Sequence, residues 1–279
     1  MQQGSMPVVR NVLTVDFEDW YQGLEIPMDR WRGFEDRIER SGRRLLDLFD
    51  ESGVKATFFV LGHVAELHPE LVREIAHRGH EVGTHGYSHS FIYRQSPDEF
   101  RRELGRSLDL LRPLSGKDVI GHRAPFFSVT RDSLWALDVM AELGLRYDSS
   151  IFPVLNYRYG IVDAPRWRHE VDAGGRRIVE FPVSTARIFG KNIPVAGGAY
   201  FRIYPYALTR AAIRAINREG HPAVFYLHPW ELDPGHPRIP LPRRVALTHY
   251  FRLDVTERRL RRLLRDFTFG PMKEALGVG

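Results

Sequence analysis

The chain of 279 residues is 43% hydrophobic, which is enough for one large α/β domain or two small ones. It contains no cysteine, so disulfides, cysteine-type zinc sites and thiol nucleophiles are excluded. The net charge is +5, and all but four of the 40 basic residues are arginines, spread along the chain beside 35 acidic residues. This spread is typical of solvated helix faces, so we expect no nucleic-acid partner.

No run of 18 apolar residues is present, and the first residues lack the charged and then apolar pattern of a signal peptide. We therefore expect a cytoplasmic protein without a transmembrane segment. Residues 1–5 precede a second methionine, Met6, and are either natural or an expression remnant.

In chain order, strand patterns and helix patterns alternate, and glycines close several of the helices. Apolar, β-branched runs predict strands at 8–17, 54–61, 80–83, 145–151 and 223–227. Amphipathic patterns predict helices at 38–51, 69–78, 96–114, 130–143, 206–219 and 256–267. This order indicates a parallel sheet covered by helices.

Polar residues follow several of these strands, which favours a (β/α) barrel of the TIM type, complete or distorted. A doubly wound open sheet is the alternative fold. No glycine-rich phosphate loop follows the first strand, which argues against nucleotide binding. We expect one domain over residues 8–272.

Two segments of this domain depart from the regular alternation. Residues 153–204 are rich in Gly, Pro, Arg and aromatic residues, and we expect an elaborated loop region with one strand at 178–183 that shapes a substrate groove. Residues 245–279 are expected to form a C-terminal helical extension. Its basic helix at 256–267 should pack on the barrel through leucines, with a membrane-surface role as the alternative.

The first strand ends in three carboxylates, those of Asp16, Glu18 and Asp19. Crowding them is costly unless a cation or a raised pKa relieves the repulsion. Strand alternation places Asp16 and Glu18 on one face, whereas Asp19 reaches the same place only if the strand ends or bulges.

His85 and His89 follow the strand at 80–83 in a segment rich in Gly and Ser. Two neutral imidazoles at this spacing can hold a divalent metal together with a carboxylate, although such pairs also occur by chance on solvated loops. Arg123 and His228 follow two further strands. A barrel would bring all these strand ends to one mouth, where a Lewis acid, a base and an acid form the inventory of a hydrolase.

The order Thr-x-Asp, His-x-x-x-His, Arg-x-Pro-Phe, an Asp-containing segment and Leu-His resembles the polysaccharide deacetylases with a NodB homology domain, carbohydrate esterase family 4. The segments 15–20, 147–153, 197–202 and 227–234 resemble more narrowly the subfamily encoded with bacterial exopolysaccharide and exosortase loci. The resemblance runs from about Val12 to Met272.

The resemblance implies a distorted (β/α) barrel that hydrolyses the N-acetyl group of an amino sugar in a polysaccharide or its precursor. It implies that Asp16 is the general base, oriented by Arg123. It also implies that His85 and His89 bind a divalent metal, usually Zn²⁺.

The same resemblance assigns the remaining roles at the site. His228 is the expected general acid, and Asp148 is expected to pair with it and raise its pKa. The backbone N–H of Phe126 is expected to contribute to the oxyanion hole, and Trp230 to contact the substrate.

Two departures from the family pattern leave alternatives open. Phe17 occupies the place of the usual metal-binding Asp, so the third ligand is either Asp19, which we favour, or Glu18. The segment around Asp148 lacks the family's Trp. A hydrolase of cyclic amides on the same fold and a non-catalytic glycan-binding module are therefore the alternative functions.

Overall fold

The computed structural model describes residues 9–277, and the question about residues 1–5 lies outside them. The main sheet has the strand order β10-β1-β2-β3-β4-β5-β7-β6, and β11 pairs with β1. Every pair is parallel except β6 with β7. In chain order the strands are β1 (Asn11–Phe17), β2 (Thr57–Val60), β3 (Glu81–Thr84), β4 (Gly121–His122), β5 (Tyr147–Asp148), β6 (His169–Ala173), β7 (Arg176–Glu180), β10 (Val224–Leu227) and β11 (Phe269–Gly270).

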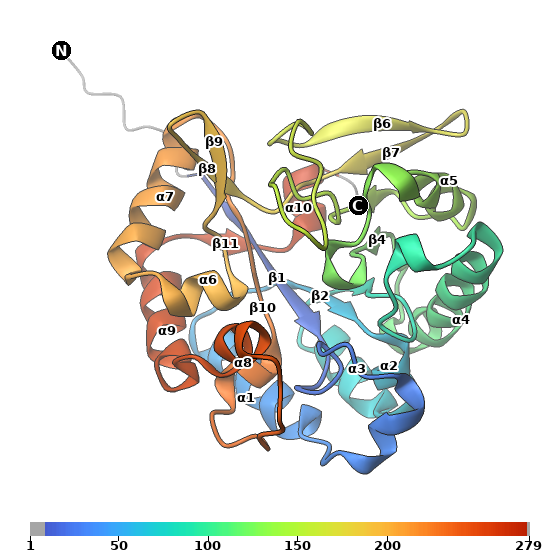
Figure 1. Ribbon diagram of the computed structural model, residues 1–279, viewed down its shortest axis with the longest axis horizontal. Coiled ribbons are helices and arrows are strands. Elements are labelled where there is room, and N and C mark those ends of the chain that lie inside the picture. The colour runs from blue at the N-terminus through green and yellow to red at the C-terminus, as the bar shows by residue number, and fades with distance from the viewer. Residues whose placement is uncertain (1–8, 278–279) are drawn as a thin grey trace.

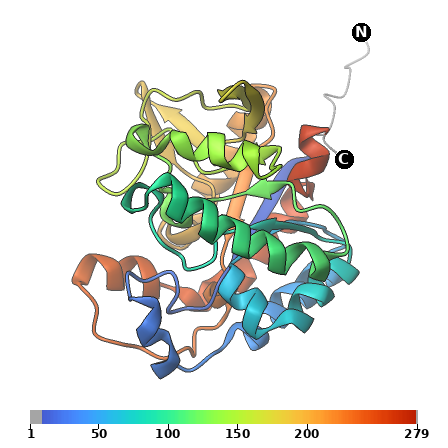
Figure 2. The ribbon, with the colours of Figure 1, turned by 90° about the vertical axis from the view of Figure 1, so that its right-hand side faces the viewer.

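Helices surround this sheet on the outside (Figures 1 and 2). In chain order they are α1 (Ile38–Glu51), α2 (Gly62–Leu67), α3 (Pro69–His77), α4 (Pro97–Ser115), α5 (Trp135–Glu142), α6 (Gly198–Ile203), α7 (Tyr206–Arg218), α8 (Arg243–Tyr250), α9 (Thr256–Asp266) and α10 (Met272–Leu276). The distorted (β/α) barrel predicted from the sequence is confirmed. Within residues 9–277, no helix has the length and apolar character that a membrane crossing requires.

Strand β1 lies between β10 and β2 in the barrel wall. All seven of its residues are buried, and it pairs with β10 on one side and β2 on the other. Its even-numbered and odd-numbered residues face opposite sides, so Phe17 packs against Phe58 in the core with 5.6 Å between ring centroids. The carboxyl end of β1 therefore delivers its polar side chains to the mouth of the barrel.

Between β7 and β10, the barrel wall is closed without a regular ladder of hydrogen bonds between strands. The backbone N–H of Val224 donates to Ser184 Oγ over 2.8 Å, and Gly197 forms a single parallel bridge with Tyr226. Both contacts come from the segment 181–198 that follows β7. This irregular seam is what makes the barrel distorted.

The segment 153–204 holds more regular structure than the sequence indicated. It contains β6 and β7, a second hairpin of β8 (Thr185–Ile188) and β9 (Lys191–Pro194), and α6. Only β7 has a continuous buried run, Ile178–Glu180, and it pairs with β5 as part of the barrel wall. The other three strands are short and only partly buried, so their apolar alternation is too weak to be found.

Two other predicted segments also differ in detail. The predicted helix at 130–143 is interrupted, because a short 3-10 turn at Arg131–Ser133 precedes α5. The extension after residue 245 contributes β11 to the sheet as well as helices, and α8 was not predicted.

Candidate active site

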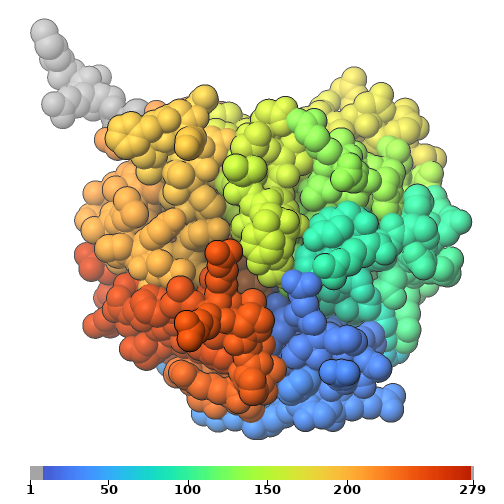
Figure 3. Space-filling model, viewed as in Figure 1, coloured from blue at the N-terminus to red at the C-terminus, as the bar shows by residue number. Residues whose placement is uncertain are grey.

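A cavity of about 190 Å³ opens at the carboxyl ends of the parallel strands. Figure 3 shows the blue, yellow-green and red-orange segments meeting around a hollow on this face of the molecule. Seven of the residues singled out from the sequence line it, namely Asp16, Glu18, His85, His89, Phe126, His228 and Trp230. The fold therefore brings the predicted constellation to one place.

Glu18, His85 and His89 form what we call the metal triad. One carboxylate oxygen of Glu18, Oε2, lies 2.5 Å from His89 Nε2 and 3.8 Å from His85 Nε2. Each of the three residues offers a ligand atom within 4.8 Å of the others, and all three are buried. Glu18 was the alternative third ligand in the sequence analysis.

The electrostatics of the metal triad suit a cation. Burial lowers the pKa of His85 to about 4, so its imidazole is neutral, as a metal ligand must be. Burial alone would raise the pKa of Glu18, but the imidazoles, His89 first, lower it to about 2. His85 Nδ1 faces the carbonyl oxygen of Arg123 at 2.7 Å, which turns Nε2 toward Glu18.

The ligand atoms of the metal triad also fit a divalent metal. Glu18 Oε2 is buried, and its close approach to His89 Nε2 lacks the geometry of a hydrogen bond. Two imidazole nitrogens and one carboxylate oxygen are the ligands that Zn²⁺ takes in catalytic sites. The residues present therefore fit the group that the resemblance implies.

Asp19, which we favoured as the third ligand, does not join the metal triad. Its Oδ2 accepts the backbone N–H groups of Arg37 at 2.6 Å and Ile38 at 3.1 Å, and its Oδ1 accepts that of Trp20. Asp19 thus holds the start of α1. Burial raises the pKa of this carboxyl to about 7, although the backbone donors oppose the rise. The chain turns away from the mouth after Glu18, which is why the two acids point to different partners.

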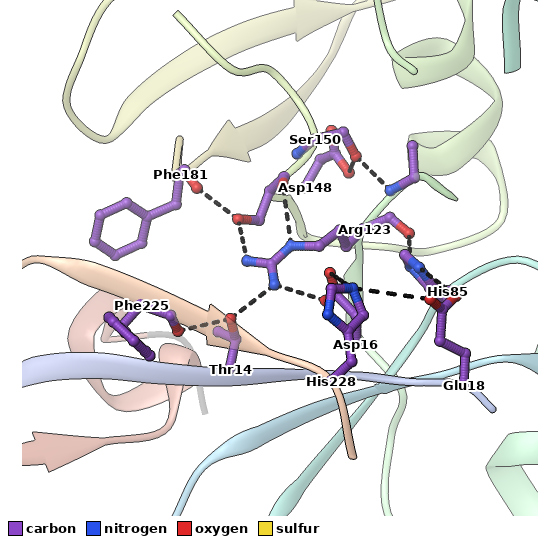
Figure 4. Close-up of polar contacts among 12 residues, drawn as sticks. Thr14, Asp16, Glu18, His85, Arg123, Asp148, Ser150, Phe181, Phe225 and His228 are labelled. Atoms are coloured by element: carbon purple, nitrogen blue, oxygen red, sulfur yellow. Dashed lines mark hydrogen bonds and ion pairs between the residues drawn. The ribbon is translucent and has the colours of Figure 1, made fainter. Parts of the chain in front are cut away.

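Asp16 is bound by Arg123, as the resemblance implied. The buried guanidinium donates from Nη1 to Asp16 Oδ1 and to Thr14 Oγ1, each over 2.7 Å (Figure 4). Its other nitrogens donate to Ser149, at the backbone O over 3.2 Å and at Oγ over 2.9 Å. These four bonds fix Arg123, and Arg123 in turn fixes one oxygen of Asp16. The other oxygen, Oδ2, lies 3.9 Å from His228 Nε2.

His228 follows β10, the neighbour of β1, and its Nε2 lies 3.8 Å from Glu18 Oε1 of the metal triad. Its Nδ1 pairs with Glu231 Oε1 at 2.9 Å. Burial lowers the pKa of His228, but the Glu231 carboxylate outweighs burial and the net direction is upward. Glu231 is itself held ionised, because Arg202 and His228 together overcome the effect of its burial and lower its pKa to about 2.

Asp148 does not pair with His228, contrary to the role implied by the resemblance. Its Oδ1 lies 2.8 Å from His122 Nδ1 and accepts a hydrogen bond from Ser150 Oγ. Ser150 Oγ accepts the backbone N–H of Ala124 over 2.7 Å, so this network holds the loop after Arg123. In the sheet order, β2, β3 and β4 lie between β1 and β5, which ends at Asp148, and β10, which precedes His228, lies on the far side of β1.

A second carboxyl stands beside Asp148 in this network. Glu180, at the end of β7, accepts the backbone N–H of Ile151 over 3.0 Å. Burial, and then the neighbouring Asp148 carboxylate, raise the pKa of Glu180 well above its usual value. This shift favours the protonated form of Glu180, which relieves the repulsion between the two acids.

Phe126 and Trp230 line the cavity as apolar side chains. Phe126 has a left-handed backbone, with φ 56° and ψ 18°, and its ring stacks on Phe91 and meets His89 edge-on. Such strain in a residue other than glycine is typical of functional sites. Trp230 stacks on His228 with 5.1 Å between ring centroids. The oxyanion and substrate roles of these two residues stay predictions.

Sequence reasoning missed Glu231, Arg202, His122 and Glu180. Two of them carried a signal, because Glu231 stands three residues after His228 and Arg202 ends one of the motifs that the resemblance used. His122 pairs with Asp148, and Glu180 stands beside Asp148. These residues end strands that are distant in sequence, and only the order of the strands in the sheet shows that they are neighbours.

Two family models match adjacent parts of the chain. Residues 31–147 match the model described as Polysaccharide deacetylase, and residues 149–277 match a Domain of unknown function (DUF3473). The first range includes His85, His89 and Arg123, and the second includes His228. Asp16 and Glu18 lie before both ranges.

Among curated relatives, a peptidoglycan-N-acetylglucosamine deacetylase of Bacillus cereus is 35% identical over 96 residues, which cover 34% of this chain and 35% of that protein. The chain spans less than half the length of the curated relatives that it matches most strongly. The similarity therefore concerns a part of each relative.

The fold is shared with solved structures at low identity. A Mycobacterium smegmatis protein classed as a polysaccharide deacetylase is 23% identical with a TM-score of 0.65, over 98% of this chain and 91% of that one. A carbohydrate esterase family 4 pseudoenzyme of Bacillus anthracis is 13% identical with a TM-score of 0.52, over 96% of this chain and 66% of that one. These likenesses establish the fold. Residues 31–147 thus match the model described as Polysaccharide deacetylase, and the described chain shares its fold with these two solved structures.

Proposed function

We propose that the protein is a metal-dependent hydrolase that removes N-acetyl groups from amino sugars of a polysaccharide or its precursor. One observation carries this proposal. The metal triad, the Arg123-bound carboxylate of Asp16 and the imidazole of His228 line one cavity, with 3.8 to 3.9 Å between His228 Nε2 and the two carboxylates. A base and an acid thus stand on either side of a cation site.

The chain's own residues divide the chemistry between them. A divalent cation bound by the metal triad would supply a Lewis acid that polarises the acetyl carbonyl and activates a water molecule. Asp16 Oδ2, the oxygen that Arg123 leaves free, would take the proton of the attacking water. His228 would give a proton from Nε2 to the departing amine, and the Glu231 carboxylate, which raises the pKa of His228, favours the protonated form that this step needs.

The finer assignments belong to the same proposal. Zn²⁺ is the metal that the two imidazoles and one carboxylate favour. An N-acetylated glycan as substrate is supported by the name of the Bacillus cereus relative, which covers a third of this chain. The role in exopolysaccharide synthesis follows from the motif resemblance alone. The cytoplasmic location and the single domain stay predictions from the sequence.

The experiment is acetate release from N-acetylglucosamine oligosaccharides by chelated and Zn²⁺-restored protein. We expect release to disappear on chelation, to return with the metal, and to be absent in His85→Ala at any metal concentration. Binding of the oligosaccharide without acetate release by metal-loaded protein would contradict the proposal and favour a glycan-binding module. Full acetate release after chelation would contradict the dependence on a metal.

A further inference from the structure

Arg202 is a buried arginine at the end of α6 that joins two parts of the cavity wall. Its Nε donates to Glu231 Oε2 over 2.6 Å. Its two Nη atoms donate to backbone carbonyls at the end of α8, those of Thr248 at 2.7 Å, His249 at 3.3 Å and Phe251 at 2.6 Å. These carbonyls are the groups that a helix end leaves unpaired, so the guanidinium both caps α8 and ties it to Glu231.

Glu231, which Arg202 holds in place, in turn holds His228. Its Oε1 accepts the backbone N–H of His228 at 3.0 Å and pairs with Nδ1 at 2.9 Å, while its Oε2 is taken by Arg202. A proton on Nδ1 fixes the tautomer and turns Nε2 toward the cavity. Glu231 and Arg202 are each 1% exposed, so neither charge has water as an alternative partner.

We call the chain of contacts from Arg202 through Glu231 to His228 the relay. Helix α8 forms the cavity wall beside it. Val245, Thr248 and His249 line the cavity, and the His249 ring stacks on Trp230 with 4.3 Å between centroids. Trp230 stacks in turn on His228. His249 Nε2 is buried without a hydrogen-bond partner among the described residues, so it offers one unused polar atom beside the cavity.

We propose that residues 149–277, which match a family model described as a Domain of unknown function, form the acid half of the active site. In this assignment Arg202 and Glu231 are positioning residues that set the ring of His228, and α8 is a wall that contacts the sugar. The inference rests on the proposed function, since it assigns positioning roles for the same reaction. It also explains why Asp148 is free to serve His122, because Glu231 has taken the place beside His228.

Arg202→Lys is the first test, with Arg166→Lys as its matched control. Lysine keeps the charge but cannot reach four acceptors from one ammonium group. Arg166 likewise joins a carboxylate, Glu219, to a backbone carbonyl, that of Thr185, but it does not line the cavity. We expect Arg202→Lys to lower kcat at least 10-fold with KM changed less than threefold, while Arg166→Lys changes neither by more than twofold.

His249→Asn tests the wall, and we expect it to raise KM at least fivefold with a smaller loss of kcat. Metal content and thermal unfolding are measured for every variant, so that loss of the metal triad or of the fold is recognised. Equal losses of kcat in Arg202→Lys and Arg166→Lys, or kcat within twofold of the wild type in Arg202→Lys, would overturn the positioning role. An unchanged KM in folded His249→Asn would overturn the assignment of α8 as a wall that contacts the sugar.

The ¹⁵N NMR signals of His228 give a readout that needs no turnover. We expect the metal-free wild type to show protonation at Nδ1, and Glu231→Gln and Arg202→Lys to shift the His228 signals while Arg166→Lys leaves them unchanged. If the wild type releases no acetate, the proposed function fails, and these spectra still decide the relay. Identical His228 signals in the wild type and Glu231→Gln would overturn it.

Discussion

At the scale of single residues, the direction of each side chain at the end of β1 decides which acid can bind a metal. Phe17 stands where the family pattern has Asp, but it points into the core, and a Cβ added at Gly42 of α1 would lie 2.9 Å from its ring. Glu18 is the next residue on the cavity side, and its longer side chain reaches both imidazoles. A carboxylate at position 17 would instead be buried among apolar groups.

Replacing each of the two acids that follow Phe17 by its amide distinguishes a metal ligand from a residue that supports the fold. We expect Glu18→Gln to lose at least 10-fold in Zn²⁺ affinity, because an amide oxygen is a weaker ligand than a carboxylate. Asp19→Asn should keep the metal and lose about 1 kcal/mol of unfolding free energy, because it weakens the bonds to the first amides of α1. Calorimetric Zn²⁺ titration and urea unfolding measure the two effects. Metal loss in Asp19→Asn alone would show that Asp19 is the ligand.

Asp16→Asn tests the base without disturbing the metal triad. The amide keeps an oxygen for Arg123 but cannot accept the proton of a water molecule. We expect turnover to fall by about 10²–10⁴-fold with metal content unchanged. Steady-state acetate release and metal analysis of the same sample measure both. A variant that lacks metal would instead make Asp16 a ligand.

His80 provides a pH dependence away from the site. It is buried between Phe49 and Phe58 and accepts the backbone N–H of Ala56 at Nδ1. Burial lowers its pKa from 6.5 to about 4. The folded state therefore resists protonation, and stability present above pH 6.5 is lost as the pH falls toward 4, by up to about 3 kcal/mol.

We expect His80→Asn, which keeps an acceptor for Ala56, to be less stable at pH 7.5 but to lose less stability between pH 6.5 and pH 4.5 than the wild type. Urea unfolding at several pH values measures the slope. Parallel curves for the two proteins would contradict the assignment of this pH dependence to His80.

At the scale of elements, the seam between β10 and the segment 181–198 determines whether the barrel closes. Gly197 has φ 121°, and a Cβ at this position would lie 1.9 Å from the carbonyl oxygen of Tyr226. The same backbone forms the bridge to β10, whose end carries His228. A side chain here would therefore push the segment 181–198 away from β10, which holds the proposed general acid.

Gly197→Ala is expected to lower the free energy of unfolding by about 3 kcal/mol or more, because backbone must move to relieve the clash. Gly190→Ala is the matched control. Gly190 has φ 76° in the β8–β9 turn with no atom near its would-be Cβ, so only the backbone cost of about 1–2 kcal/mol applies. Guanidinium unfolding compares the two variants. Equal losses would show that the seam is not tightly closed.

The elements also show how far sequence reasoning reaches. The long amphipathic pattern of α1 gave both of its ends, and the buried runs gave β1, β2 and β10. Between residues 169 and 194, β7 was predicted in part, as a strand at 178–183. Its partner β6 and the β8–β9 hairpin were missed, because their strands are four or five residues long and partly exposed. Short strands of this kind gain their stability from neighbours that periodicity does not reveal.

The same limit applies to the candidate site. Residue types and strand ends indicated Asp16, Arg123 and the two imidazoles, because parallel strands share one mouth. The choice between Glu18 and Asp19 depended on where the chain turns after β1. The partner of His228 depended on which strand ends are neighbours, and Asp148 lies on the wrong one. Such choices are made by tertiary packing rather than by local pattern.

At the scale of the whole molecule, the two matched ranges form one barrel. Strand β1 lies before both of them and pairs with β2 from the first range and β10 from the second. The cavity likewise takes its metal triad from residues 18–89 and His228 from the second range. We therefore expect neither range alone to form the cavity.

The most direct measurement is a crystal structure of the Zn²⁺-loaded protein with anomalous data at the zinc absorption edge. The account predicts one strong peak at about 2.0–2.2 Å from Glu18 Oε2, His85 Nε2 and His89 Nε2, facing Asp16 across the cavity. A peak bound by Asp19, or no peak among these three residues, would contradict it.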